Sequence, residues 1–173
     1  MPINRRAWVL GLLALSGALP RSEARAQGFE FQPWDARIKA PAFAHLDVQG
    51  QLWRLEDLKG RVVLINFWAS WCPPCLSEMP SLQTLVELYG TDKLTVLAVN
   101  FKQSVPVIES FVKRTALQLP VLPDPQGQVA RQWGVKVFPT TVIFGADGRL
   151  RGVVRGELDW TGSEANRLLQ PLF

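Results

Sequence analysis

The chain has 173 residues, of which 47% are hydrophobic and 20% are charged, a composition that suits one folded domain and excludes a disordered chain. The formal net charge is +4. Residues 1–26 hold four arginines and one glutamate, a local charge of +3, which leaves about +1 for the rest of the chain. Because the net charge of residues 27–173 is close to zero, this part of the chain lacks the basic surface that nucleic-acid binding requires, so we expect no nucleic-acid partner.

The N-terminal segment has the pattern of an export signal, in which a basic start is followed by a short apolar run and then by small residues. These features are Arg5 with Arg6, residues 8–19 and Ala24-Arg25-Ala26. The apolar run is too short to span a bilayer comfortably. We predict a cleavable signal peptide over residues 1–26, a mature chain that begins at Gln27, and a periplasmic location. The alternative is an uncleaved signal that anchors the protein in the membrane.

The hydrophobic pattern predicts an alternation of strands and helices. Residues 27–42 show no clear periodicity and are interpreted as a linker or loose extension, followed by a β-hairpin over residues 43–53. The later elements are expected as a buried strand over 62–68, a helix over 73–89, a buried strand over 94–100, a helix over 105–115, a turn at 124–125, a short helix over 128–133, strands over 140–144 and 150–155, and a helix over 160–169. This order favours one α/β domain over residues 43–173, a three-layer α/β/α sandwich with a central mixed sheet and an N-terminal β-hairpin extension.

Cys72 and Cys75 are the only two cysteines, and a disulfide between them would close a loop of two residues. Such a loop removes little entropy from the unfolded chain, so a redox role explains the pair better than a stabilising role. Cys72 lies where a buried strand gives way to a helix, and the helix N-terminus favours the reactive thiolate. Cys75 follows one turn later and is expected to be the more buried thiol, which would resolve a mixed disulfide formed on Cys72.

Other uses of a Cys-x-x-Cys motif find little support. A zinc site needs about four ligands, and this chain offers two cysteines and the single histidine His45, which we interpret as structural. Covalent haem attachment needs a histidine directly after the second cysteine, where the chain has Leu76. No nucleotide or flavin motif is visible, and we expect neither a metal nor an organic cofactor.

The motif and its surroundings resemble the TlpA/ResA-type branch of the thioredoxin superfamily. The resemblance covers roughly residues 40–172. It is strongest in Val63 to Cys75 with its Trp71-Cys72-Pro73-Pro74-Cys75 motif, in Glu78-Met79-Pro80, and in Gly134 to Phe144 with Asp147-Gly148. The resemblance implies a thioredoxin-like fold and a cis peptide bond before Pro139, which would face the cysteines. It also implies that Trp71 and Phe138 flank the groove in which an extended substrate segment docks.

Asn66 and Glu78 are the two residues near the cysteines that bear on proton transfer. Many thioredoxins carry a buried aspartate six residues before the first cysteine, and here that residue is Asn66, which cannot accept the proton of the resolving thiol. Glu78 matches a glutamate that reductases of this branch place near the active site. If it is partly buried, its pKa is raised and it can exchange protons with a cysteine. A solvated position on the helix surface is the equal alternative.

These observations predict a thiol–disulfide oxidoreductase that reduces disulfides of other exported proteins. The resemblance suggests cytochrome c maturation or metal-centre assembly as the setting, with electrons from a membrane-linked thiol reductant, and we expect a monomer. An oxidase or isomerase is the first rival, although no large helical insertion is visible. A thiol peroxidase would need a P-x-x-x-[ST]-x-x-C motif that the chain lacks. A non-catalytic module that binds copper or a partner chain is the last alternative.

Overall fold

The computed structural model describes residues 28–173, and the expected signal peptide lies outside them. The middle layer is a six-stranded mixed sheet in the order β1-β8-β7-β4-β5-β6. Its strands are β1 (Phe29–Pro33), β4 (Val62–Trp68), β5 (Leu94–Phe101), β6 (Val121–Asp124), β7 (Thr140–Phe144) and β8 (Leu150–Gly156). Strands β4, β5 and β6 run parallel to one another, whereas β7 pairs antiparallel with β4 and β8, and β1 antiparallel with β8.

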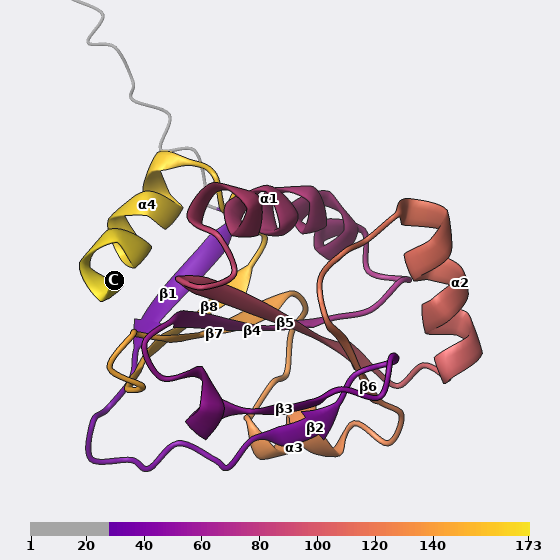
Figure 1. The fold of residues 1–173 in the computed structure, drawn as a ribbon, viewed down its shortest axis with the longest axis horizontal. Coiled ribbons are helices and arrows are strands. Elements are labelled where there is room, and N and C mark those ends of the chain that lie inside the picture. Colours follow the sequence, from indigo (N-terminus) through magenta and orange to yellow (C-terminus); the bar gives the residue numbers. More distant parts are fainter. Residues whose placement is uncertain (1–27) are drawn as a thin grey trace, which may run out of the picture.

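Helices and a small hairpin cover the two faces of the sheet (Figure 1). One face carries α1 (Pro73–Tyr89), α2 (Val105–Thr115) and α4 (Ser163–Leu169), which is followed by η2 (Gln170–Leu172). The other carries α3 (Gln128–Gln132), η1 (Leu55–Leu58) and the antiparallel pair β2 (Ala44–Leu46) with β3 (Leu52–Arg54). The predicted three-layer α/β sandwich with its N-terminal hairpin is therefore confirmed.

Strand β4 is buried on both faces, which explains its continuous hydrophobic sequence. Leu64 and Trp68 contribute to the core under α1, whereas Ile65 and Phe67 contribute to the core on the side of α3 and the hairpin. The strand therefore has a fixed position between two cores. The cysteine motif begins at Trp71, with two residues between it and the end of β4, so it emerges from a strand that is buried on both faces.

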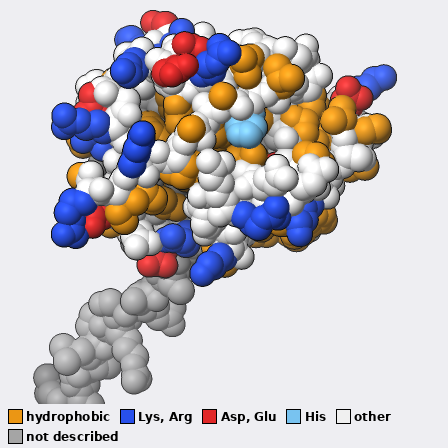
Figure 2. All heavy atoms as spheres, turned by 90° about the horizontal axis from the view of Figure 1, so that it is seen from below, with side chains coloured by type: hydrophobic (Ala, Val, Ile, Leu, Met, Phe, Trp, Pro, Cys, Tyr) orange, Lys and Arg blue, Asp and Glu red, His pale blue; other side chains and the backbone are white. Residues whose placement is uncertain are grey.

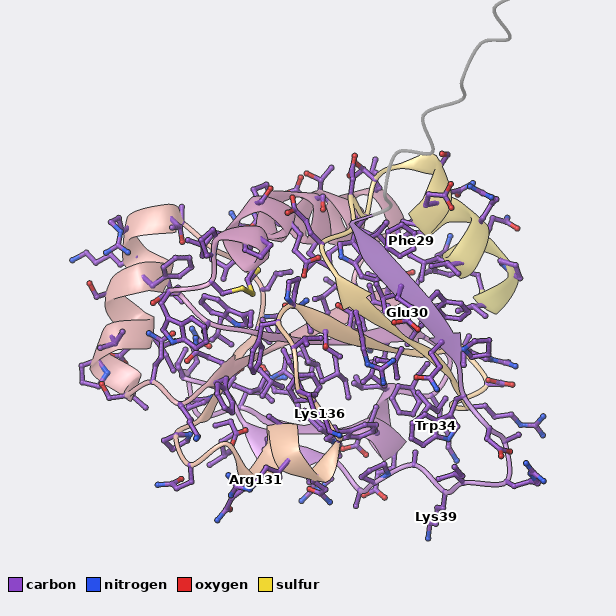
Figure 3. All side chains as sticks on the ribbon, turned by 180° about the vertical axis from the view of Figure 1, so that it is seen from behind. Phe29, Glu30, Trp34, Lys39, Arg131 and Lys136 are labelled. Atoms are coloured by element: carbon purple, nitrogen blue, oxygen red, sulfur yellow. A yellow bond between two sulfur atoms is a disulfide. The ribbon has the colours of Figure 1, made fainter. Side chains whose placement is uncertain are left out.

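The segment that the sequence analysis interprets as a loose extension contains a strand of the main sheet. Strand β1 pairs with β8 from Phe29 opposite Gly156 to Pro33 opposite Gly152. Figure 3 shows Phe29, Glu30 and Trp34 along this strand and just beyond it. A Cβ atom on Gly152 would lie 2.5 Å from the ring of Phe31, so this glycine gives the phenylalanine room to pack.

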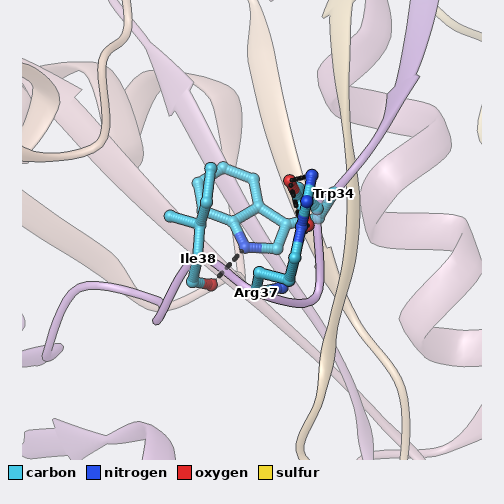
Figure 4. A network of polar contacts seen from close by, with 4 residues as sticks. Trp34, Arg37 and Ile38 are labelled. Carbon is cyan, nitrogen blue, oxygen red and sulfur yellow. Dashed lines mark hydrogen bonds and ion pairs between the residues drawn. The ribbon is translucent and has the colours of Figure 1, made fainter.

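A compact loop follows β1. The indole N–H of Trp34 donates a 2.8 Å hydrogen bond to the carbonyl of Ile38, and Arg37 forms an ion pair with Asp35 at 2.7 Å (Figure 4). The interpretation of residues 27–42 as a loose linker is thus wrong for the part that contains β1 and this loop. The alternation of Phe29, Glu30 and Phe31 is too short to identify a strand without its partner.

Two further elements differ from the prediction. The edge strand β6 was not expected, because its four residues include Pro123 and end in the predicted turn. Helix α4 begins at Ser163 rather than at residue 160, and the preceding segment places the buried side chains of Leu158 and Trp160 against the core. None of the helices within residues 28–173 has the length and apolarity that a bilayer crossing demands.

Candidate active site

The two cysteines lie at the N-terminus of α1 and form a disulfide (the yellow bond in Figure 3), with their Cα atoms 5.3 Å apart. Cys72 is the N-cap of the helix in an extended conformation, and its Sγ accepts a 3.3 Å hydrogen bond from the backbone N–H of Cys75. Pro73 opens the helix where no backbone donor is needed. In the reduced protein, the same N–H group and the helix dipole would stabilise a thiolate on Cys72.

Both cysteines are buried, and Cys75 is buried more completely than Cys72. Cys72 is 5% exposed and Cys75 is 0% exposed. The preceding residue, Trp71, is 59% exposed and stands at the surface beside the disulfide. A partner can therefore approach the site from the side of Trp71 and Cys72, whereas Cys75 lies behind Cys72.

Aromatic residues border the cysteines. The peptide bond between Phe138 and Pro139 is cis. The ring of Phe138 meets the ring of Trp71 edge-on at a centroid distance of 6.1 Å, and on its other side it packs on Phe101 at 4.7 Å. Trp71 and Phe138 thus lie together beside the motif, as the resemblance implies.

Glu78 is buried one turn beyond Cys75, so the partly buried alternative describes it better than the solvated one. One carboxylate oxygen, Oε1, accepts a 2.7 Å hydrogen bond from the side chain of Asn66. The other, Oε2, accepts bonds from the backbone N–H of Leu158 at 3.2 Å and from the indole N–H of Trp160 at 3.3 Å. Burial raises the pKa of Glu78 to about 7, opposed by these three donors and assisted by the negative charge of Glu157. Near neutral pH this carboxyl can therefore give or take a proton.

Asn66 is fully buried on β4 and faces α1. Its amide nitrogen donates both to Glu78 and, at 2.9 Å, to the hydroxyl of Thr141 on β7. Its amide oxygen has no hydrogen-bond partner in the described part of the chain. The residue thus serves as a neutral donor at the position where many thioredoxins have a carboxylate.

A second polar network holds the loop that precedes Cys72. The side-chain oxygen of Gln103 accepts bonds from the backbone N–H of Ser70 at 2.8 Å and from the amide of Asn100 at 3.0 Å. Its side-chain nitrogen donates to the hydroxyl of Ser70 at 2.8 Å. Gln103 follows β5, so this network ties the loop after β5 to the loop after β4 and fixes the approach to the motif.

His45 lies on the β2–β3 hairpin, where its ring meets that of Phe43 edge-on at 4.8 Å. It is half-buried, and burial lowers its pKa against the opposing charge of Asp124. In Figure 2 the single histidine stands among apolar side chains on the face opposite to α1. Across residues 28–173, no three side chains of the His, Cys, Asp and Glu types gather in a way that could hold a metal ion.

Comparisons with known proteins identify the family. The AhpC/TSA family model matches residues 37–153, which is more than half of the chain. The chain belongs to the AhpC/TSA family. Among curated members, the thiol-disulfide oxidoreductase ResA of Bacillus cereus is 31% identical over 149 residues, which make up 86% of this chain and 86% of that protein.

Solved structures that superpose on this chain agree with the family assignment. A DsbF homologue from Corynebacterium diphtheriae superposes with a TM-score of 0.69 at 28% identity, covering 86% of this chain and 96% of that one. The exposed lipoprotein thioredoxin Etrx1 of Streptococcus pneumoniae superposes with a TM-score of 0.64 at 32% identity, covering 76% and 98%. This AhpC/TSA chain is accordingly a thiol–disulfide oxidoreductase with a thioredoxin-like fold and a redox cysteine pair.

Sequence reasoning missed three side chains of the site in this AhpC/TSA protein. Asn66 was recognised only as a residue that cannot carry a proton, not as the donor that holds Glu78. Trp160 was placed inside a helix, and Gln103 was not singled out. Each of them acts across the fold on a residue at least 12 positions away, so no local pattern could have revealed the contact.

Proposed function

We propose that this protein works outside the cytoplasm as a reductase of disulfides in other exported proteins. The observation that carries the proposal is the disulfide at the N-terminus of α1, with Cys72 only 5% exposed but next to the exposed Trp71, and with Cys75 and Glu78 buried more deeply. A structural disulfide would not need a helix N-terminus, an exposed neighbouring tryptophan and a buried titratable carboxyl in one place. The substrates to test first are disulfides of apocytochrome c and disulfides between cysteines that ligate metal centres once they are reduced.

The reaction balances as a two-electron exchange. The Cys72 thiolate attacks one sulfur of a substrate disulfide, so that a mixed disulfide forms and one substrate thiolate leaves and is protonated. Cys75 then loses its proton and attacks Cys72, which releases the second substrate thiol and restores the Cys72–Cys75 disulfide. The substrate gains two electrons from the protein and two protons, one from Cys75 and one from solvent, which received it when the Cys72 thiol ionised. A membrane-linked thiol reductant returns them to the protein.

Glu78 is the group that we assign to the proton of Cys75. Residues three apart on a helix share a face, and Cys75 and Glu78 are both buried on α1. With a pKa of about 7, Glu78 is partly ionised at neutral pH and can accept a proton that a buried thiol otherwise holds. A buried Cys75 thiol that has to lose a proton, and a Glu78 carboxyl that can accept one near neutral pH, support a role for Glu78 as the general base in the resolving step.

The backbone of Phe138 supports docking of an extended substrate segment. Among the backbone hydrogen bonds of residues 28–173, none uses the N–H or the carbonyl of Phe138, whereas the carbonyl of Pro139 accepts a 2.9 Å bond from Gly156. Free backbone groups beside the exposed Trp71 and the half-buried Phe138 are what an added strand requires. The substrate segment would therefore lie along Phe138, with its cysteine opposite Cys72.

Export is supported by the N-terminal pattern and by the similarity to a protein described as an exposed lipoprotein thioredoxin. N-terminal sequencing of the protein from its host tests this part. A chain that begins at or near Gln27 in the soluble exported fraction is expected. Membrane-bound material that still begins near Met1 would contradict cleavage and favour an anchor.

Trapping tests the reductase itself. In Cys75→Ala the attack still occurs but resolution cannot, so exported proteins should accumulate as mixed disulfides that reductant releases, while Cys72→Ala should trap none. Equilibration with glutathione then gives the direction of electron flow. A reductase should have a potential near that of thioredoxin, about −270 mV, whereas a value near −120 mV would indicate an oxidase. Tight binding of Cu(I) by the reduced protein without any trapped partner would favour a metal-binding module instead.

A further inference from the structure

A lysine next to the proposed docking groove occupies a backbone conformation that residues with side chains seldom adopt. Lys102 has a φ of 52°, in the left-handed region that favours glycine. It follows the last residue of β5, and its backbone N–H donates a 3.0 Å bond to the carbonyl of Asp124. A glycine would make this turn without steric cost, so the fold alone does not explain a lysine here.

The exposed side chain of Lys102 lies against an aromatic ring. Its ammonium nitrogen lies 5.1 Å from the centre of the Phe101 ring, a distance at which a cation and an aromatic face attract. A Cβ atom on Gly127 would come within 3.0 Å of the Lys102 side chain and 2.7 Å of the Phe101 ring. The bare backbone of Gly127 therefore leaves the space in which the lysine and the ring lie together.

The ring under Lys102 belongs to the aromatic row of the active site. Phe101 packs on Phe138, which in turn meets Trp71 beside Cys72. A segment docked along Phe138 would thus pass within reach of Lys102 on one side and Cys72 on the other. An extended polypeptide advances about 3.3 Å per residue, so a side chain a few residues from the attacked cysteine can approach the ammonium group.

No acidic group of the described chain neutralises this lysine. The ion pairs within residues 28–173 do not include Lys102. The carboxylate of Asp124, next to it in the fold, is buried and accepts the backbone N–H groups of Val129 and Ala130. A second cation is close, because the Arg131 guanidinium would also contact a Cβ atom on Gly127, at 3.4 Å (Arg131 is labelled in Figure 3).

We infer that Lys102 is a specificity residue that binds an acidic side chain of the substrate, so that disulfides followed or preceded at short range by Asp or Glu are reduced preferentially. The inference rests on the proposed reductase function and names the substrate class for that site. The cation–π contact with Phe101 keeps the ammonium group on the side of the aromatic row, where an acidic side chain of a docked segment can meet it. It acts on substrate binding and encounter and leaves the thiol chemistry to the cysteines.

The test uses synthetic peptides closed by one disulfide and extended by an arm that carries a single Glu or a single Gln about two, four or six residues from the cysteine. The reduced full-length mature protein is mixed with each peptide, and the second-order rate constant of the single-turnover reduction is measured. At one arm position the Glu peptide should react about three- to fivefold faster than the Gln peptide at low salt, as an exposed ion pair allows. High salt should bring this ratio toward one.

Variants assign the preference to Lys102. Lys102→Gln should bring the Glu-to-Gln rate ratio close to one, Lys102→Glu should bring it below one, and Lys102→Arg should keep it. Lys113→Gln, which removes an exposed lysine from α2, is the matched control and should keep both rates and their ratio. Lys102→Gly should raise the urea midpoint, because it relieves the left-handed conformation, and should lose the preference.

The possible failures are distinguishable. Equal reduction of Glu and Gln peptides by the wild type would overturn the specificity inference and leave the reductase function standing. A preference that survives in Lys102→Gln would assign it to another residue and also overturn the inference. If the wild type reduced none of the peptides and Cys75→Ala trapped no exported partner, the proposed function itself would fail.

Discussion

The side-chain amide of Asn66 on β4 donates a 2.7 Å hydrogen bond to the carboxylate of Glu78 on α1, and both residues are buried. This bond joins the strand that leads into the cysteine motif to the helix that follows it. An asparagine at this position can donate to a carboxylate without adding a second charge. The site therefore contains one buried titratable carboxyl instead of two.

The first prediction concerns stability and pH. The pKa of Glu78 is raised in the folded protein from 4.5 to about 7, so the folded state binds the proton more tightly than the unfolded state does. Stability should therefore fall as pH rises from about 4.5 to about 7, by up to about 3 kcal/mol. Glu78→Gln should lack this loss, which urea unfolding at about pH 5 and about pH 8 measures.

Glu78→Gln can be accommodated because the amide oxygen of Asn66 has no hydrogen-bond partner in the described part of the chain. If the Asn66 side chain turns so that this oxygen faces α1, it can accept a hydrogen bond from the new amide nitrogen at position 78. Glu87→Gln, an exposed change on the same helix, is the control and should follow the wild-type pH dependence. A wild-type stability that stayed constant between about pH 5 and about pH 8 would contradict a buried, proton-binding Glu78.

The second prediction concerns the rate of exchange. If Glu78 accepts the proton of Cys75, resolution of a mixed disulfide should accelerate as pH rises through about 7 and should then level off. Glu78→Gln should lose this inflection and react more slowly at neutral pH, by about 100-fold, the lower end of the range for a general base. Stopped-flow exchange across the neutral range gives both profiles. Superimposable profiles would leave solvent water as the proton acceptor.

The third prediction adds a second carboxylate. Asn66→Asp would place two carboxyl groups within hydrogen-bond distance in a buried site, where both cannot ionise without a large penalty. We expect a loss of about 3–5 kcal/mol at about pH 8, with much of it recovered at about pH 5, where a shared proton can bridge the pair. Asn100→Asp is the matched control, because Asn100 is equally buried on the neighbouring strand. A loss of the same size and pH dependence in both variants would show that desolvation alone is responsible.

The parts of the site that could be predicted from sequence are those that short stretches of chain determine. Strand β4, helix α1 and the order of the two thiols follow from a hydrophobic run, a 3.6-residue period and the spacing of Cys72 and Cys75. The environment of Glu78 could not be predicted, because its donors Leu158 and Trp160 come from a segment 80 or more residues away. Only the assembled tertiary structure brings that segment onto α1.

The strand β1 illustrates the same limit for the fold. Its five residues end in Pro33, and no local pattern distinguishes them from an irregular extension. Their structure depends on β8, more than 100 residues later, which supplies the hydrogen-bond partners and the glycine that accommodates Phe31. A strand defined mainly by its partner is not visible in a window of sequence.

The fourth prediction concerns the two thiols of the reduced protein. The Cys72 thiol, at the N-cap of α1, should have a pKa below the free value of about 8.5, and the Cys75 thiol should have one above it because it is fully buried. Thiolate absorbance against pH in Cys75→Ala and in Cys72→Ala reports the two values separately. Alkylation should be at least about tenfold faster at Cys72 at neutral pH. Faster alkylation of Cys75 would reverse the proposed roles.

The last prediction concerns the packing of β1 on β8. In Gly152→Ala the new Cβ atom would meet the ring of Phe31 at 2.5 Å and the carbonyl oxygen of Gln32 at 2.7 Å, so β1 has to shift. We expect a loss of about 1–3 kcal/mol, the usual range for overpacking, together with faster amide hydrogen exchange in β1 than in β4. Phe31→Ala in the same chain should recover part of the loss, because it removes the ring but not the backbone contact.

Gly145→Ala is the control, since the nearest atoms to its Cβ atom belong to the Arg151 and Asp147 side chains, which can move away. Equal stability of Gly152→Ala and Gly145→Ala, with unchanged exchange in β1, would mean that the strand does not pack against Gly152 in solution.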